Sequence, residues 1–205
     1  MDFLPLIVTS PSGAGKTTLV RRMLEASPDF VQSVSYTTRA PRLGEVDGRD
    51  YHFIGLAEFR EMADRGGFAE WAEVHGNCYG TGLKRVEQAR ATHRGMVFVI
   101  DFQGARQIKA RIPEAVGVFV LPPSFAVLEQ RLRGRGTDAE EVITRRLANA
   151  RGEMQHYGLF DYLIVNDVLD DAVAELSAVV RAERARRWRR APLAEQVLRD
   201  GRVER

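Results

Sequence analysis

The chain has 205 residues, of which 44% are hydrophobic, 30 are basic and 28 are acidic. This length and composition favour a globular protein with one core and small appended lobes, and they argue against a disordered chain. The net charge of +2 gives no support to a nucleic-acid-binding protein. The single cysteine, Cys78, cannot form a disulfide within the chain, which fits a reducing compartment.

The N-terminal segment does not resemble a secretory signal peptide. Asp2 stands where a basic residue is expected, and Pro5 interrupts the short apolar stretch that follows. The longest apolar runs, such as residues 96–100, have the length of a strand and are far too short to cross a bilayer. We therefore expect a soluble cytoplasmic protein without a membrane partner.

Predicted strands and helices alternate along most of the chain. Short apolar runs are typical of strands buried on both faces of a parallel sheet, and the amphipathic segments between them predict helices. The predicted strands cover residues 4–9, 96–100, 116–121 and 162–165, and the predicted helices cover 17–26, 83–93, 103–111, 124–133, 138–156 and 170–190. This alternation predicts an α/β fold with a doubly wound parallel sheet.

Two segments interrupt the alternation. Residues 34–83 are rich in Gly, Tyr, Thr and Arg and predict a small inserted lobe, while residues 132–156 predict a mobile, charged helical lid. The remainder of this single domain is a core of residues 1–33, 84–131 and 157–190, followed by an arginine-rich tail at 181–205. We expect the tail to be a solvated helix end, and contact with an acidic partner or RNA is the alternative.

The most informative motif is Ser10-Pro-Ser-Gly-Ala-Gly-Lys-Thr17, which lies between a predicted strand and a predicted helix, as a P-loop does. Backbone N–H groups and the helix N-terminus form an anion cavity there, and glycines allow close approach to phosphate oxygens. Lys16 is expected to neutralise ATP phosphates and Thr17 to coordinate Mg²⁺. Ser10 departs from the pattern, which commonly has glycine there. The predicted ATP-binding residues of this segment are Ser10, Pro11, Ser12, Gly13, Ala14, Gly15, Lys16, Thr17 and Thr18.

A strand-end acid, Asp101, is the candidate second ligand of the hydrated magnesium. Capping of the following helix is the alternative role for this residue. The segment Asp101-Phe-Gln-Gly104 also matches the D-x-x-G pattern of GTPases. A GTPase would need an Asn-Lys-x-Asp motif as well, and none of the asparagines at 77, 149 and 166 is followed by Lys. The sequence therefore excludes a GTPase.

The predicted lobe carries the segments Ser35-Tyr-Thr-Thr-Arg39-Ala-Pro-Arg42, Gly44-Glu-Val-Asp-Gly48-Arg-Asp-Tyr51, Glu70-Trp-Ala-Glu73 and Gly76-Asn-Cys-Tyr79-Gly-Thr81. From the P-loop to about Ala185, the chain closely resembles the guanylate kinase family, with the same segments in the same order. The elements T-T-R-x-P-R and G-x-D-Y of that family are much more specific than a P-loop. The resemblance implies a P-loop nucleoside-monophosphate kinase fold, in which a parallel sheet core carries an inserted GMP-binding lobe and a helical lid.

The resemblance also implies a role for each polar residue of the lobe. It implies that Arg39, Arg42, Tyr51 and Tyr79 hold the phosphate of GMP, and that Ser35, Glu70 and Thr81 read the guanine. Their chemistry agrees, because arginines make forked bonds to phosphate, and one carboxylate can accept from both N1–H and the 2-amino group of guanine. The alternatives are that the arginines form surface ion pairs, that the tyrosines are packing residues, and that Glu70 is a solvated surface acid.

The lid and the last predicted strand supply the remaining implied residues. The resemblance implies that the transferring phosphoryl group is surrounded by Arg131, Arg135 and Arg146. It also implies that adenine is contacted by Asn166 and Asp167. Arginines delivered by lid closure can stabilise the charge that develops on the phosphoryl oxygens. One position departs from the family: Val99 stands where an acid is common, which puts a peripheral contact near GMP or magnesium in doubt.

We therefore expect a Mg²⁺-dependent kinase that transfers the γ-phosphoryl group of ATP to GMP, and also to dGMP. No general base is needed, because the acceptor phosphate is already anionic. The presence of Lys16 and Thr17 argues against a non-catalytic scaffold module of the same family. The residues that are implied to read guanine argue against a kinase for another monophosphate. ATP and GMP are the expected partners. No nucleic acid is expected, and whether the chain forms a homo-oligomer stays open.

Overall fold

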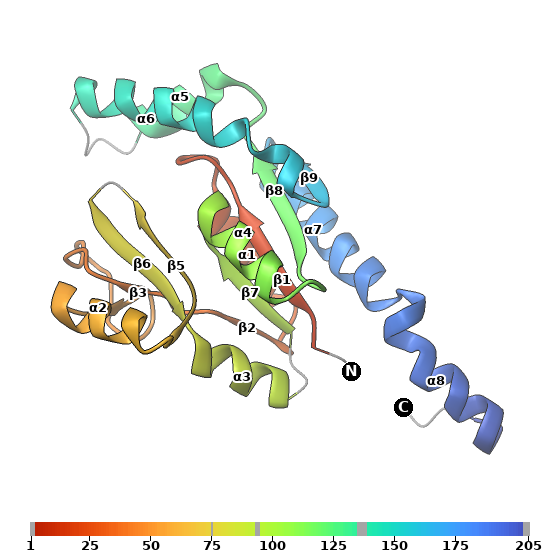
Figure 1. Ribbon diagram of the computed structural model, residues 1–205. Coiled ribbons are helices and arrows are strands. Elements are labelled where there is room, and N and C mark those ends of the chain that lie inside the picture. Colours follow the sequence, from red (N-terminus) through yellow and green to blue (C-terminus); the bar gives the residue numbers. More distant parts are fainter. Residues whose placement is uncertain (1–2, 75, 93–94, 135–138, 203–205) are drawn as a thin grey trace.

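The computed structural model describes residues 3–74, 76–92, 95–134 and 139–202. Its core is a parallel sheet in the order β2-β7-β1-β8-β9 (Figure 1). The strands are β1 Pro5–Thr9, β2 Phe30–Gln32, β7 Gly95–Val99, β8 Val116–Leu121 and β9 Tyr162–Val165. The four predicted core strands are present. The edge strand β2, which has only three residues, was missed because its apolar run is too short to stand out.

Helices cover both faces of this sheet, as a parallel sheet requires. On one face α1 Lys16–Glu25 and α7 Leu169–Arg184 pack against Leu6 and Val8 of β1, and on the other face α3 Leu83–Ala91 and α4 Phe102–Arg111 pack against Ile7. Successive side chains of a strand point to opposite faces, so β1 contributes to both clusters and is buried along its whole length. The P-loop therefore begins from the most deeply buried strand of the protein.

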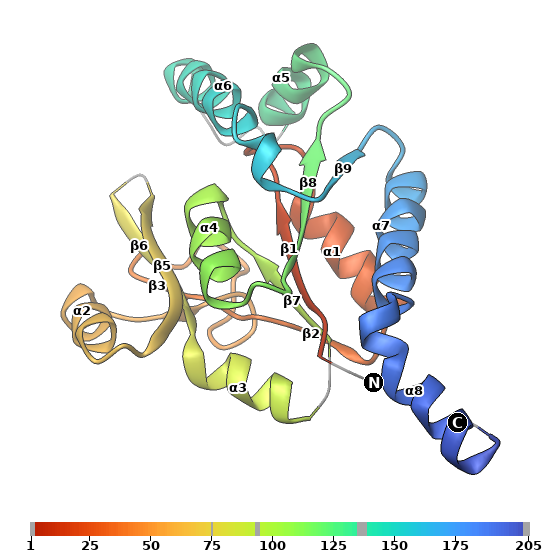
Figure 2. The same ribbon diagram turned by 45° about the vertical axis from the view of Figure 1, so that its right-hand side comes forward.

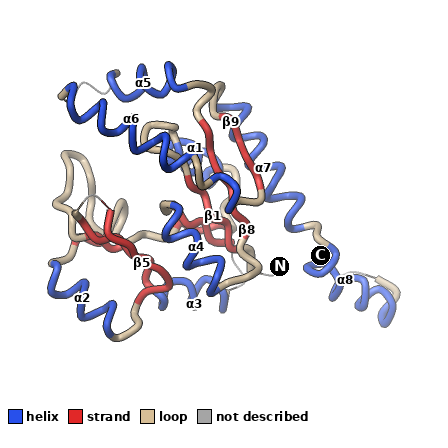
Figure 3. The backbone as a smooth tube through the Cα atoms, turned by 45° about the horizontal axis from the view of Figure 1, so that its top comes forward, coloured by secondary structure: helices blue, strands red, loops and turns tan. Residues whose placement is uncertain are grey.

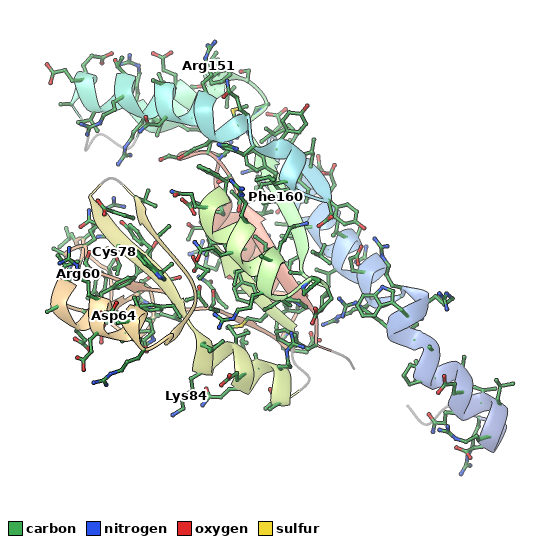
Figure 4. The ribbon with its side chains drawn as sticks, in the orientation of Figure 1. Arg60, Asp64, Cys78, Lys84, Arg151 and Phe160 are labelled. Carbon is green, nitrogen blue, oxygen red and sulfur yellow. The ribbon has the colours of Figure 1, made fainter. Side chains whose placement is uncertain are left out.

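The predicted inserted lobe is a second, four-stranded sheet in the order β4-β3-β6-β5. Its elements are β3 Tyr36–Thr37, β4 His52–Phe53, α2 Leu56–Asp64, β5 Phe68–Val74 and β6 Asn77–Gly82. Phe59, Phe68 and Cys78 form its small buried cluster, and Cys78 is labelled on β6 in Figure 4. In Figure 2 the helix α4 lies between this lobe and the core sheet, and α4 packs against β5.

The segment predicted as a lid, residues 132–156, contains the end of α5 Phe125–Arg133 and all of α6 Glu140–Met154, which the short helix η1 Tyr157–Leu159 joins to β9. Most of α5 was predicted as core but packs against α6, so the two helices together are called the lid below. Figure 3 shows α5 and α6 together at one end of the molecule. Leu128, Leu132 and Ile143 are buried between them, and Arg133 of α5 pairs with Glu140 of α6. A methyl group at Gly13 of the P-loop would lie 2.9 Å from Leu132, so the lid packs directly on the loop.

The arginine-rich end forms two helices where a single helix 170–190 was predicted, and most of its described residues are exposed. The helix α7 ends at Arg184, and a separate helix α8 Arg187–Asp200 continues away from the core (Figure 1). Arg189 is only 7% exposed, and its Nη1 donates to the carbonyl oxygen of Phe3 at 2.7 Å. The arginine at 189 therefore fastens α8 to the start of β1. No helix in the described part of the chain is long and apolar enough to cross a membrane.

Candidate active site

The P-loop needs glycine at two positions for its backbone. Gly13 and Gly15 have φ angles of 94° and 90°, in the left-handed region that side chains with a Cβ disfavour. Gly15 is the N-cap of α1 and supplies no side chain, so no cap covers the first N–H groups of the helix. Exposed N–H groups at a helix N-terminus, with the positive end of the helix dipole, favour an anion.

The side chain of Asn166 forms a hydrogen bond to the backbone of the P-loop. Its Nδ2 donates to the carbonyl oxygen of Ala14 at 2.7 Å, and a Cβ at Gly15 would clash with the same nitrogen. The sequence predicted Asn166 and Asp167 as adenine contacts. In the structure Asn166 is buried and holds the loop, while the carbonyl oxygen of Asp167 accepts from Arg131 at 3.4 Å. Contact with adenine stays a prediction.

Lys16 is the first residue of α1, and its ammonium lies at the C-terminal edge of the core sheet. Its Nζ donates to the carbonyl oxygen of Ile100 at 3.4 Å. Burial lowers the pKa of Lys16, and the charges of Glu153 and Asp101 oppose that shift. A half-buried ammonium with one long hydrogen bond retains donors for phosphate oxygens.

The lid reaches the P-loop through Glu153, which the sequence analysis did not single out. The backbone N–H of Ser12 donates to Oε2 of Glu153 on α6 at 3.1 Å. The two residues are 141 positions apart, and Glu153 stands in a helix that already carries several charged residues. No local pattern in the sequence could have distinguished it from a solvated acid.

Asp101 caps α4, as the alternative interpretation expected. Its Oδ1 accepts from the N–H of Gly104 at 2.9 Å, and its Oδ2 accepts from Nε2 of Gln103 at 3.2 Å. The same carboxylate lies on the wall of a cavity that Lys16 also lines. Capping and magnesium binding are compatible, since a carboxylate has more acceptor positions than the cap uses. The magnesium role stays a prediction.

Two adjoining cavities separate the core from the lobe. The first, of about 150 Å³, is lined by Lys16, Ser35, Tyr51, Glu70, Ala72, Val74, Tyr79, Val99, Ile100 and Asp101. The second, of about 620 Å³, is lined by Thr17, Arg21, Gln32, Ser33, Ser35, Arg42, Glu45, Arg49, Asp50, Tyr51 and Val99. Three residues, Ser35, Tyr51 and Val99, line both cavities. The structure therefore brings predicted ATP-binding and GMP-binding residues to one continuous cleft, and Val99 faces it with an apolar side chain.

The predicted phosphate-binding residues of the lobe form one cluster. Arg39 lies over the ring of Tyr51, 5.4 Å from its centroid, and the rings of Tyr51 and Tyr79 are 6.0 Å apart. Arg39 also pairs with Glu45 at 2.8 Å, and Glu45 accepts from the N–H of Arg42 at 2.7 Å. Burial raises the pKa of Tyr51, so its hydroxyl remains a donor. The ion-pair alternative for Arg39 is thus present, with Glu45 as a partner that the sequence did not indicate.

The predicted guanine-reading residues are buried. Glu70 on β5 is 5% exposed, Ser35 is 8% exposed, and Thr81, paired with Glu70 across β5 and β6, is fully buried. The hydroxyl of Thr81 has no hydrogen-bond partner among the described residues. Burial raises the pKa of Glu70 to about 7; a hydrogen bond from the Thr81 backbone opposes this shift, and the negative charge of Asp101 adds to it. Glu70 is therefore not a solvated surface acid.

The lid arginines lie away from these cavities. Nη1 of Arg131 is buried and has no hydrogen-bond partner in the described part of the chain, which leaves a charged donor for an anion. Arg146 lies on α6 and is half-buried. Arg135 falls outside the described residues. Neither Arg131 nor Arg146 lines the core–lobe cleft, so their contact with a transferring phosphoryl group stays a prediction.

The chain is similar in sequence and in fold to known proteins of one family. A family model described as Guanylate kinase matches residues 3–183. A guanylate kinase of Aromatoleum aromaticum is 59% identical over 181 residues, which are 88% of this chain and 89% of that protein. The crystal structure of guanylate kinase from Anaplasma phagocytophilum has a TM-score of 0.80 at 32% identity and covers 99% of this chain and 97% of that one.

A second solved structure shares the fold alone. The SH3-kinase fragment of tight junction protein 3 has a TM-score of 0.52 at 13% identity, covering 89% of this chain and 58% of that one. Its low identity carries no argument about activity. The family model and the two relatives above, in contrast, match nearly the whole chain. The chain therefore belongs to the guanylate kinase family.

Proposed function

We propose that this chain transfers the γ-phosphoryl group of ATP to GMP, which yields ADP and GDP, and that dGMP is a second acceptor. The observation that carries the proposal is the position of Lys16 and Glu70 on the wall of one cavity. Lys16 belongs to a loop whose N–H groups fit a polyphosphate, and Glu70 is a buried acceptor that fits the two adjacent donors of guanine. These two kinds of chemistry in one cleft suit transfer between two nucleotides.

On the acceptor side the lobe would orient GMP. Glu70, ionised, accepts from N1–H and the 2-amino group, and a hydroxyl from Ser35 or Thr81 donates to O6. The phosphate would lie between Arg39 and the hydroxyls of Tyr51 and Tyr79. The attacking phosphate oxygen is already anionic, so positioning and electrostatic stabilisation carry the rate without a general base.

On the donor side the P-loop would hold the β- and γ-phosphates. Lys16 supplies the charge that neutralises their oxygens, and Asn166 keeps the loop in shape through its bond to the Ala14 carbonyl. The buried Nη1 of Arg131 is a charged donor suited to the transferring group. With Arg146 it would stabilise the charge on the phosphoryl oxygens once the lid has closed.

Magnesium fits the residues present. Oxygen donors suit this hard cation, and the hydroxyl of Thr17 is exposed at the mouth of the P-loop while the Asp101 carboxylate lines the same cleft. No cluster of three or more His, Cys, Asp or Glu residues able to hold a metal occurs among the described residues. Two protein ligands agree with an ion that is mainly bound by phosphates and water, and Mg²⁺ would supply charge neutralisation there.

A coupled assay for ADP release tests the proposal directly. The purified protein, with ATP and Mg²⁺, is offered GMP, dGMP, AMP, UMP and CMP in turn. We expect rapid ADP release with GMP and dGMP and almost none with the other three. Absence of GMP-dependent ADP release from a folded protein would favour a scaffold module of the same fold, and equal use of AMP would reject guanine as the recognised base.

A further inference from the structure

Gly104, in the first turn of α4, lies directly behind the carboxylate of Glu70. A Cβ atom built at Gly104 would lie 2.5 Å from Oε2 of Glu70 and 3.1 Å from its Cδ. The first distance is well inside van der Waals contact, so a side chain at 104 and the carboxylate in its present position exclude each other. The two residues come from different elements and are brought together by the packing of α4 against β5.

Nothing in the local backbone requires glycine at this position. Gly104 is not among the residues with positive φ, and it lies inside a regular helix, where glycine is less favourable than alanine. Its N–H caps the helix by donating to Asp101, but alanine has the same N–H. The space that a side chain would need is instead occupied, mainly by the Glu70 carboxylate and to a lesser extent by Cβ of Ile100, which would lie 3.3 Å away.

The direction in which Glu70 could move is limited. Thr81, fully buried, faces it across the sheet, and Gly104 forms the wall behind it, whereas the cavity lies on the open side. A methyl group at 104 would therefore push the carboxylate toward the cavity. Because Oε2 is the end of a flexible side chain, the carboxylate would yield before the helix does.

We propose that Gly104 is a positioning residue that determines how deeply the Glu70 carboxylate sits, and thereby the discrimination of guanine from other bases. This inference rests on the proposed GMP kinase function. It also accounts for the glycine of the Asp101-Phe-Gln-Gly104 segment, which the GTPase comparison left without a role. Asp101 caps the helix, and Gly104 makes room for Glu70.

The test is Gly104→Ala, assayed for kcat and KM with GMP, IMP and ATP. We expect KM for GMP to rise at least about tenfold, the loss typical of one misplaced charge-assisted hydrogen bond. IMP lacks the 2-amino group and gains less from Glu70, so the preference for GMP over IMP should shrink. KM for ATP and kcat at saturating GMP should change by less than about threefold, because the P-loop is untouched.

Gly152→Ala is the matched control, since Gly152 also lies inside a helix and a Cβ there meets nothing within 4 Å. It should leave KM for GMP and the melting temperature near those of the parent protein. A parent-like KM and preference for GMP in Gly104→Ala would overturn the inference and leave the proposed function intact. Failure of the parent protein to use GMP would instead overturn the function itself.

A second variant decides the matter if Gly104→Ala folds poorly. Glu70→Asp shortens the side chain by one methylene, so the methyl group at 104 should cost less in that background. We expect Gly104→Ala to raise KM for GMP less in Glu70→Asp than in the parent protein, and to be better folded there; such non-additivity is the signature of direct contact. Two outcomes would contradict the inference: additive effects of the two substitutions on KM, or a double variant that unfolds as readily as Gly104→Ala. Either would show that glycine is needed at 104 for a reason other than contact with Glu70.

Discussion

The two halves of the cleft are built in different ways. The P-loop presents mainly backbone N–H groups from consecutive residues, between a fully buried strand and the N-terminus of α1. The lobe presents side chains from several short strands and loops, held over a small cluster of Phe59, Phe68 and Cys78. Backbone groups recognise a charge and tolerate changes such as Ser10, whereas side chains recognise a particular base. The donor half should thus be robust and the acceptor half selective.

The largest expected effect is on the selectivity of the acceptor half. AMP offers a lone pair at N1 and no 2-amino group, so it leaves the buried Glu70 unpaired. A site built around buried polar groups can reject such an analogue by about 10⁴-fold in kcat/KM. Glu70→Gln should weaken the use of GMP and narrow the gap to AMP, because an amide can turn its donor toward adenine N1. Similar kcat/KM values for AMP and GMP in the parent protein would break the comparison.

A smaller but still large effect is expected in the donor half. Lys16→Ala should fold normally and lose at least about a hundredfold in kcat, as deletion of one transition-state charge contact does. The control is Lys84→Ala: Lys84 is exposed on α3, and Figure 4 shows it at the surface of that helix, far from the P-loop. Turnover close to that of the parent protein in Lys16→Ala would remove the lysine from the mechanism.

The sequence predicted the donor half of the cleft better than the acceptor half. The P-loop, the four longer core strands and α1 were predictable, because contiguous motifs and apolar periodicity specify them. The lobe residues became interpretable only through resemblance to a family, since residues such as Tyr51 and Glu70 reach the same cavity only through tertiary folding. The partners Glu45, Gly104 and Glu153 were not predicted, and neither was the burial of Arg189. Their contacts depend on packing between elements and leave no periodic trace.

The pH dependence of GMP use tests the acceptor half more finely. Burial raises the pKa of Glu70 to about 7, and guanine requires its ionised form. GMP binding should therefore be strongest above this pKa and weaken as pH falls through it. Between pH 8 and pH 6 the ionised fraction falls roughly tenfold, so KM for GMP should rise about tenfold. In Glu70→Gln only the change due to titration of the GMP phosphate itself should remain, so this variant gives the baseline.

The same group makes an opposite contribution to stability. The pKa of Glu70 in the folded protein lies above the value of about 4.3 expected for an unfolded chain. The folded state therefore binds more protons between these two values, and the free energy of unfolding should fall as pH rises across that interval. Thermal melts of the parent protein and Glu70→Gln at pH 5 and pH 8 measure this difference. A parent protein that gains stability relative to Glu70→Gln as pH rises would contradict the raised pKa.

The smallest expected effect concerns Glu153, which brings a negative charge to a loop suited to anions. Its carboxylate accepts from the N–H of Ser12 and acts on Lys16 through its charge, so it opposes the approach of ATP phosphates. Glu153→Gln keeps the size and the acceptor while removing the charge. Because Glu153 is half-buried and screened by solvent, we expect KM for ATP to fall by only about two- to fivefold, with KM for GMP unchanged.

Glu141→Gln, an exposed acid on the same helix, is the matched control and should leave KM for ATP unchanged. The opposite result for Glu153→Gln, a higher KM for ATP, would mean that the carboxylate holds the P-loop and Lys16 in a productive shape. The donor half would then depend on a side chain 141 positions away from the loop. The shape of the P-loop would then not be set by its backbone alone. The donor and acceptor halves would both rely on distant side chains, and they would differ only in the ligand that each recognises.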